Sequence, residues 1–147
     1  MELKSYNVQE IDAYVALFLK VFEKEPWNDK WPSFERAKSY LTDLSQTPGF
    51  RGFVATKNST IVSICFGYIM KWWQGDEYFV KEFFVDDTMQ NQGIGSILYD
   101  YMVQNLQKEK VRTITLLTEK SIPAFQFYQK KGLTLSEDTV FLYQNIS

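Results

Sequence analysis

The stretch FFVDDTMQNQGIGS, residues 83–96, carries the clearest pattern in the chain. An apolar, strand-like run ends at Val85, a polar loop follows, and a helical pattern begins after Gly93. Glycine lets a backbone approach a ligand closely, and the first N–H groups of a helix lack acceptors within that helix. Together with the positive end of the helix dipole, these groups form a site for an anion such as phosphate or pyrophosphate.

The two glycines of this stretch fit more than one role. A Walker loop requires Gly-Lys-Ser/Thr, which is absent, and the dinucleotide fingerprint requires a third glycine where this chain has Leu98. Gly93 and Gly95 could also serve only to let a helix and a strand pack closely. On the glycines alone, an anion site and a packing role both stay open.

Outward from this stretch, the pattern of apolar residues predicts a single domain over residues 1–147 with the element order βααβββαβαββ. Ser33 is the expected N-cap of the second helix, and the step around Gly93 predicts a parallel strand pair. The fold class is α+β, an α/β/α sandwich in which four helices cover a mixed, mostly antiparallel sheet of about seven strands. The expected strands are 3–8, 50–56, 61–73, 78–85, 111–118, 133–135 and 139–146, and the expected helices are 11–22, 33–45, 94–106 and 121–131.

The composition excludes several kinds of chemistry. The 147 residues include no histidine and a single cysteine, so neither a Ser-His-Asp system nor a zinc site of thiolates and imidazoles can form. The net charge of −2 offers no general attraction for nucleic acid. No apolar run is long enough for a transmembrane helix and no signal-peptide pattern opens the chain, so we expect a cytoplasmic protein without membrane contact.

Two segments resemble a known family. Gln90-Asn91-Gln92-Gly93-Ile94-Gly95 resembles the Arg/Gln-x-x-Gly-x-Gly/Ala loop of the GNAT superfamily of N-acetyltransferases. AFQFYQKKGL, residues 124–133, resembles the second signature of that family, Ala-x-x-(Phe)-Tyr-x-x-x-Gly-Phe. The two segments stand in the family's order, and the predicted elements match the GNAT fold along nearly the whole chain. The resemblance implies this fold and acetyl-CoA as a co-substrate, without a metal.

The resemblance also implies which residues hold the donor. The strand 78–85 is expected to splay from the strand 111–118, with pantetheine in the gap, bound by backbone groups near Phe84 and Val85. The amides that would bind the CoA pyrophosphate belong to Gln90, Asn91, Gln92, Gly93, Ile94, Gly95 and Ser96.

Two further positions in the second signature could contact the donor. Ser121 stands where the family often has an asparagine that binds pantetheine, and capping of the following helix explains this serine at least as well. Lys130 could contact the CoA phosphates, or, together with Lys131, complement the dipole at the end of its helix.

Glu82 and Tyr128 are the candidate catalytic residues. Strand alternation places Glu82 on the face of Tyr78, Val80 and Phe84, among apolar groups whose desolvation would raise its pKa toward that of a useful base. Binding of a cationic substrate or of a neighbouring lysine, without proton transfer, is the alternative role for this carboxylate. Tyr128 matches the family's tyrosine that protonates the departing thiolate, and packing in the core beside Phe125 is its alternative.

The remaining candidates concern the acceptor. By the resemblance, Trp27, Trp31, Trp72 and Tyr78 lie in segments that wall the acceptor site, where aromatic faces with carboxylates suit a cationic amine; packing at the ends of the core explains them equally well. Cys65 is expected to be a buried structural thiol.

The expected activity is acetyl transfer from acetyl-CoA to a primary amine of a small molecule, directly within a ternary complex. A protein or peptide acceptor, or a catalytically silent acyl-CoA-binding domain, is the alternative. A homodimer is allowed, because the sequence does not determine the oligomeric state.

Overall fold

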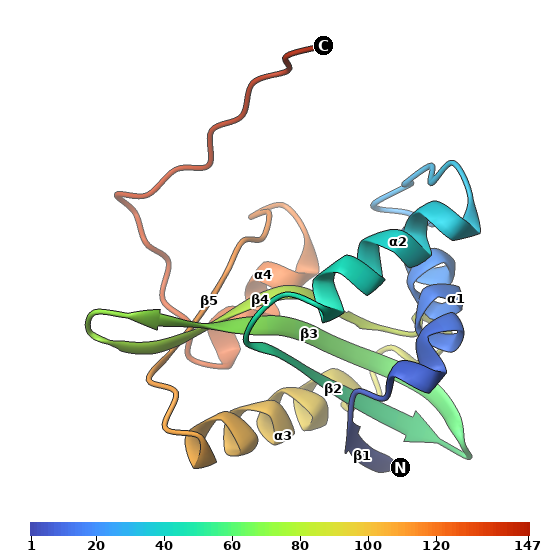
Figure 1. The fold of residues 1–147 in the computed structure, drawn as a ribbon, viewed down its shortest axis with the longest axis horizontal. Coiled ribbons are helices and arrows are strands. Elements are labelled where there is room, and N and C mark those ends of the chain that lie inside the picture. Colours follow the sequence, from blue (N-terminus) through green and yellow to red (C-terminus); the bar gives the residue numbers. More distant parts are fainter. The chain divides into compact units, whose positions relative to one another are not determined.

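A computed structural model describes all residues of the chain, 1–147, and divides them into two compact units, Met1–Leu117 and Thr118–Ser147. The first unit contains one sheet with its helices, and the second contains a single α-helix, α4 (Pro123–Lys130) (Figure 1). In chain order, the elements of the first unit are β1 (Glu2–Ser5), the 3-10 turn η1 (Val8–Glu10), α1 (Ile11–Phe22), α2 (Phe34–Ser45), β2 (Phe50–Lys57), β3 (Thr60–Trp72), β4 (Gly75–Val85), the 3-10 turn η2 (Asp87–Met89), α3 (Ile94–Lys108) and β5 (Thr113–Leu116).

The sheet has five strands in the order β1-β2-β3-β4-β5. Strands β1 to β4 pair antiparallel and β4 pairs parallel with β5, which confirms the mixed, mostly antiparallel sheet and the parallel step around Gly93. The two strands expected within residues 133–146 are wrong, because this segment forms no ladder with any strand. Its apolar pattern resembles that of a strand, but Phe141 and Leu142 are 71% and 84% exposed. A strand needs a hydrogen-bonded neighbour as well as a suitable pattern.

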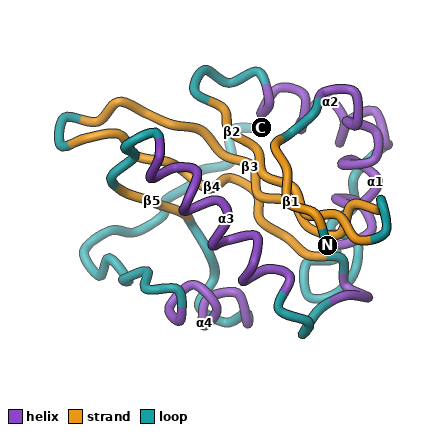
Figure 2. The backbone as a smooth tube through the Cα atoms, turned by 90° about the horizontal axis from the view of Figure 1, so that it is seen from below, coloured by secondary structure: helices purple, strands orange, loops and turns teal.

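Each face of the sheet is covered by different helices. On one face, α1 and α2 pack on Val54, Ile64, Phe66 and Phe84, and these residues form the main hydrophobic core. On the other face, Met102 of α3 contacts Cys65, with 3.4 Å between the two sulfur atoms. Figure 1 shows α1 and α2 on one side of the sheet and α3 on the opposite side, and Figure 2 shows α3 lying across the strands.

A β-bulge in β4 reverses the expected alternation. Phe66 pairs with Glu82, but the next residue of β3, Gly67, pairs with Val80, so Lys81 is an extra residue in β4. The expectation that Glu82 shares a face with Tyr78 and Val80 is therefore wrong. With the bulge, Glu82 lies on the face of α1 and α2, while Tyr78 and Val80 lie on the face of α3.

The helix ends agree with the sequence pattern in one case and differ in another. The Ser33 hydroxyl accepts a hydrogen bond from the Arg36 amide at 3.1 Å, so the predicted N-cap of α2 is confirmed. Helix α4 instead has Ile122 at its N-cap, without a side-chain cap, and Pro123 at its first position. The capping role considered for Ser121 is therefore wrong. No helix combines the length and the apolar character needed to cross a membrane.

Candidate active site

Asp86 fixes the start of the loop that leads into α3. Its carboxylate accepts hydrogen bonds from the backbone amide and the hydroxyl of Thr88, at 2.9 and 2.7 Å, and so caps η2. The same carboxylate forms an ion pair with Lys20 of α1, at 2.9 and 3.0 Å. Burial alone would raise the pKa of Asp86, but the hydrogen bonds from Lys20 and Thr88 outweigh it and lower the pKa. The ion pair between Asp86 and Lys20 therefore ties the start of the loop to α1.

The loop ends in a left-handed turn that leaves the start of α3 uncapped. Gly93 is the N-cap at φ 77°, and no side chain accepts from the first amides of the helix. The first helical bond that includes the cap joins the Ile97 amide to the Gly93 carbonyl at 3.0 Å, so the amides of residues 94–96 precede the hydrogen-bonded part of the helix. A Cβ atom at Gly93 would meet no protein atom within 4 Å. Unused donors beside open space, at a positive helix end, fit a phosphate group.

Strands β4 and β5 part just before this loop. Their pairing extends from Glu77 opposite Thr113 to Val80 opposite Leu116 and stops there, while β4 continues to Val85. Strand β5 is thus shorter than the range expected from the sequence, 111–118, and residues 81–85 of β4 have no partner in β5. On the opposite edge of β4, the Phe84 carbonyl accepts a hydrogen bond from the Ser63 hydroxyl at 2.8 Å. Glu82 and Phe84 lie in the part of β4 beyond Val80, which does not pair with β5.

Glu82 is a half-buried carboxylate on the face of the sheet that α2 covers. The Tyr40 hydroxyl of α2 donates a hydrogen bond to its Oε2 atom. Burial raises the pKa of Glu82, the Tyr40 hydrogen bond and the charge of Lys81 lower it, and Asp29 raises it, with a net upward shift. A carboxylate with a raised pKa holds a proton more readily than an exposed glutamate, which suits a general base near neutral pH.

Two of the predicted acceptor tryptophans belong to the aromatic cluster that includes Tyr40, the partner of Glu82. Trp31 packs against Tyr40 with ring centroids 5.6 Å apart, and against Phe18 at 5.3 Å. Trp27 packs against Phe22 at 5.0 Å and stays 39% exposed. Phe18 and Phe22 both contact Phe84, so both tryptophans border the aromatic cluster in which Phe84 lies.

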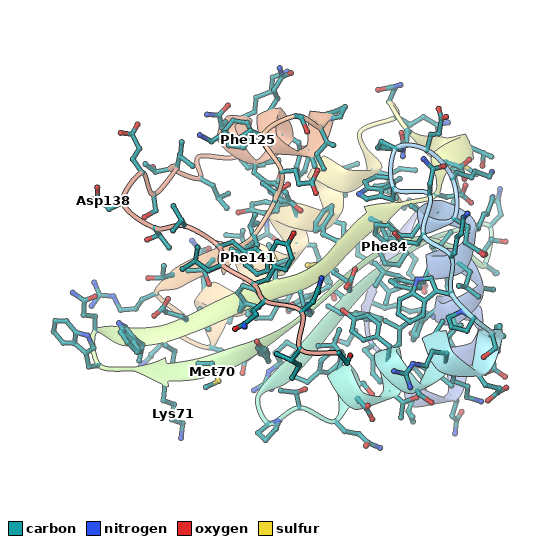
Figure 3. The ribbon with its side chains drawn as sticks, turned by 90° about the horizontal axis from the view of Figure 1, so that it is seen from above. Met70, Lys71, Phe84, Phe125, Asp138 and Phe141 are labelled. Atoms are coloured by element: carbon teal, nitrogen blue, oxygen red, sulfur yellow. The ribbon has the colours of Figure 1, made fainter.

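The structure separates the other two predicted acceptor residues from Glu82. Tyr78 is fully buried and its hydroxyl donates to the Arg51 carbonyl at 2.8 Å, so its predicted place in the acceptor wall is wrong. Trp72 is six residues along β3 from Phe66, the partner of Glu82, which corresponds to about 20 Å at ~3.3 Å per residue. Met70 and Lys71, which precede it in β3, lie far from Phe84 in Figure 3. Trp72 therefore belongs to the exposed β3–β4 hairpin.

In the second unit, α4 carries Tyr128. This side chain is 9% exposed, and its ring lies 5.4 Å from that of Phe127. Gly132 at φ 95° ends the helix, and the Leu133 amide donates to the Tyr128 carbonyl at 3.1 Å, the bond of a Schellman motif. Lys130 lies exposed in the last turn, where it complements the helix dipole.

Cys65 agrees with its expected structural role. The side chain is fully buried in β3, and burial raises the pKa of its thiol to about 12. The residue that the sequence pattern did not single out is Tyr40. It lies three residues after the buried Ala37 and four before the buried Leu44, so helical spacing alone places it on the inner side of α2.

The mixed sheet leads into a glycine-bearing helix start that no side chain caps, and a half-buried carboxylate lies on the preceding strand. These features define an α+β protein with backbone donors suited to an anion. The model of the Acetyltransferase (GNAT) family matches residues 12–133, and the chain therefore belongs to this family. The GNAT family generally uses acetyl-CoA. A search of curated proteins finds no significant relative.

Solved structures share the fold at low sequence identity. An aminoglycoside acetyltransferase from an uncultured soil metagenomic sample, in complex with sisomicin, has a TM-score of 0.78 at 22% identity, covering 99% of this chain and 96% of its own. A possible acetyltransferase from Clostridium difficile 630 has a TM-score of 0.83 at 16% identity, covering 99% and 98%. A transcriptional regulator from Bacillus halodurans C-125 has a TM-score of 0.77 at 15% identity, covering 97% and 99%. These similarities establish the fold.

Proposed function

We propose that this protein is an N-acetyltransferase that moves the acetyl group of acetyl-CoA to a primary amine of a small molecule, directly within a ternary complex. The observation that carries the proposal is the uncapped start of α3 at Gly93, in a member of the GNAT family. It offers backbone donors for the CoA pyrophosphate. Half-buried Glu82, on β4 just beyond the end of its pairing with β5, would supply the general base that the reaction needs.

The residues expected to hold the donor belong to the loop and to the end of β4. The amides of residues 90–96 would bind the pyrophosphate, and backbone groups near Phe84 and Val85 would bind pantetheine. Polarisation of the thioester carbonyl by a backbone N–H would favour attack on it, as in other oxyanion sites. Lys130 and Ser121 are further candidates for contacts with the donor. When bound, acetyl-CoA supplies an acetyl group activated as a thioester.

Glu82 and Tyr128 would move the protons. An amine is protonated at neutral pH, so Glu82 first takes a proton from the ammonium group and frees the nitrogen lone pair. A carbon–nitrogen bond then forms, the carbon–sulfur bond breaks, and Tyr128 donates its phenolic proton to the sulfur. The nitrogen loses its second proton as the amide forms, which allows the tyrosinate to be reprotonated. The products of the overall reaction are one acetamide, one free thiol and one released proton.

The surroundings of Glu82 favour a cationic small molecule as acceptor. The partly buried rings of Trp31 and Tyr40 provide aromatic faces, and Asp29 adds a second carboxylate whose charge acts on Glu82. The similarity to a structure solved with sisomicin, which carries several amines, supports this class of acceptor by analogy of fold only. Trp27 and Trp31 are the expected contacts from the connector between α1 and α2.

Thiol release from acetyl-CoA in the presence of aminoglycosides, polyamines, amino-acid derivatives and short peptides tests the proposal. At least one small amine should release thiol, and Glu82→Gln and Tyr128→Phe should each reduce kcat while CoA still raises the melting temperature. A CoA-induced increase in melting temperature without thiol release from any amine would instead indicate a silent acyl-CoA-binding domain. If saturating CoA leaves the melting temperature unchanged, the assignment of the loop is wrong.

A further inference from the structure

We propose that Tyr40 is a positioning residue for Glu82: its hydroxyl holds the Oε2 atom and leaves Oε1 to accept the proton of the acceptor amine. The inference rests on the proposed function, because it assigns a role to a residue beside the proposed base. The role of Tyr40 can be tested separately, because the pKa of Glu82 can be measured without any acetyl transfer.

Tyr40 is held firmly by the helix that carries it. Its neighbours Ala37 and Leu41 are fully buried, so this side of α2 is fixed against the sheet. The Tyr40 ring packs against both Trp31, with centroids 5.6 Å apart, and Phe18, at 5.9 Å, and these two rings also contact each other at 5.3 Å. Such packing fixes the direction of the phenol, which points at the Glu82 carboxylate and donates to Oε2.

The hydrogen bond also divides the roles of the two carboxylate oxygens. Glu82 forms no ion pair, and Tyr40 is its only hydrogen-bond donor within the protein, so Oε1 receives none. A buried carboxylate that could rotate freely would present either oxygen in several directions. With Oε2 held by Tyr40, Oε1 points in one direction, which is what proton abstraction from a bound amine requires.

Tyr40 also counteracts burial at Glu82. The charged and titratable groups around the pair come from each element packed against it: Lys81 on β4, Asp29 in the connector before α2, and Tyr68 on β3. Burial and Asp29 favour the protonated form of Glu82, whereas Tyr40 and Lys81 favour the carboxylate. Burial, followed by the charge of Glu82, raises the pKa of Tyr40 itself, so the phenol remains a donor over the whole working pH range.

Tyr40→Phe removes the hydroxyl and keeps the ring that packs on Phe18 and Trp31. Since a hydrogen bond to a charged group is lost, the pKa of Glu82 should rise by about one to two units. The acidic limb of kcat/KM should move to higher pH by the same amount. On the acidic side of the profile, kcat/KM of Tyr40→Phe should be roughly 10- to 100-fold lower than that of the unmodified chain, mostly through a lower kcat. A residue that serves only for packing would leave the pH profile in place.

Tyr6→Phe is the matched control. The Tyr6 hydroxyl is buried and has no hydrogen-bond partner, and its ring packs against Phe66, the residue opposite Glu82. This variant removes the same atom from the same side of the sheet without removing a bond to Glu82. Its pH profile should match that of the unmodified chain.

Carbon-13 NMR of glutamate carboxyl groups gives the second readout, with the Glu82 signal assigned from Glu82→Gln. The pKa of Glu82 should be higher in Tyr40→Phe than in the unmodified chain and unchanged in Tyr6→Phe. An equal pKa in Tyr40→Phe and in the unmodified chain would overturn the inference, whether or not any amine is acetylated. Conversely, failure of every amine to release thiol overturns the proposed function, and the NMR titration still decides the role of Tyr40.

Discussion

Substitution of Gly93 tests the anion site at its most sensitive point. The residue has a φ of 77°, and a Cβ built on it would meet no protein atom within 4 Å. Gly93→Ala therefore meets no steric clash within the protein. It introduces backbone strain and places a methyl group in the space that the proposal assigns to the CoA pyrophosphate.

The two effects have separate magnitudes. A non-glycine residue in the left-handed region costs about 1–2 kcal/mol, which should appear as a lower free energy of unfolding. If the methyl group prevents one charge-assisted hydrogen bond from a backbone amide, a further loss of about 1.5–3 kcal/mol falls on CoA binding. At ~1.4 kcal/mol per factor of ten, this corresponds to a dissociation constant for CoA raised roughly 10- to 150-fold.

Two further variants separate strain from obstruction. Gly132→Ala is matched for strain, since Gly132 has a φ of 95° and also has no atom within 4 Å of a built Cβ, but it lies at the end of α4. It should lose a similar free energy of unfolding and keep its affinity for CoA. Gly93→Asn should be less strained than Gly93→Ala, because asparagine tolerates the left-handed region, yet it occupies more space.

Calorimetric titration with CoA and urea denaturation measure the two quantities. The reasoning requires that Gly93→Asn is more stable than Gly93→Ala and binds CoA at least as weakly. If CoA affinity instead follows stability across the three variants, strain explains the loss and the pyrophosphate does not occupy this space. Unchanged affinity in both Gly93 variants would refute the site.

Three further predictions concern the scaffold around the site. Gly67→Ala should lower the free energy of unfolding by about 1–3 kcal/mol in urea denaturation, because the added Cβ would lie 2.2 Å from the Phe79 carbonyl oxygen. A variant as stable as the unmodified chain would contradict this close approach of β3 and β4 beside the bulge. Asp86→Asn should cost about 1.5–3 kcal/mol at pH 7. Since the pKa of Asp86 is lowered on folding, this cost is present above its ordinary pKa and disappears as the pH falls through the lowered value. A pH-independent difference would show that neither the Lys20 ion pair nor the Thr88 hydrogen bonds lower this pKa. Cys65 should react with a thiol reagent at pH 8 only after unfolding, because burial raises its pKa to about 12, and rapid reaction in the native state would show that β3 opens.

Much of the first unit could be predicted from local pattern. Helix α1 has the expected range, Ile11–Phe22, because its apolar residues recur at helical spacing and pack on the sheet. The loop into α3 could be predicted because Gly93 adopts the backbone conformation that glycine alone adopts without strain. The strands expected after α4 could not, since pairing depends on a neighbour that periodicity does not identify.

The face on which Glu82 lies could not be obtained from alternation, because one inserted residue reverses it. A signal was nevertheless present in the sequence: Gly67 interrupts the apolar run of β3, and an isolated glycine in a strand often marks a bulge or a close approach of backbone. Here both apply, since a Cβ at Gly67 would lie 2.2 Å from the Phe79 carbonyl and 2.7 Å from the Tyr78 ring. The place expected for Tyr78 is wrong for the same reason as the face expected for Glu82.

The bulge at Lys81 also determines the surroundings of Glu82, the proposed base. Without it, Glu82 would follow Tyr78 and Val80 onto the face of α3, among fully buried groups such as Cys65, where an ionised carboxylate is costly. With it, the carboxylate lies on the face of α2, where the Tyr40 hydroxyl meets it. The residues after the bulge are also those that continue beyond the end of β5. One extra residue in β4, accommodated by a glycine in β3, thus determines both the face on which Glu82 lies and the partner that holds it.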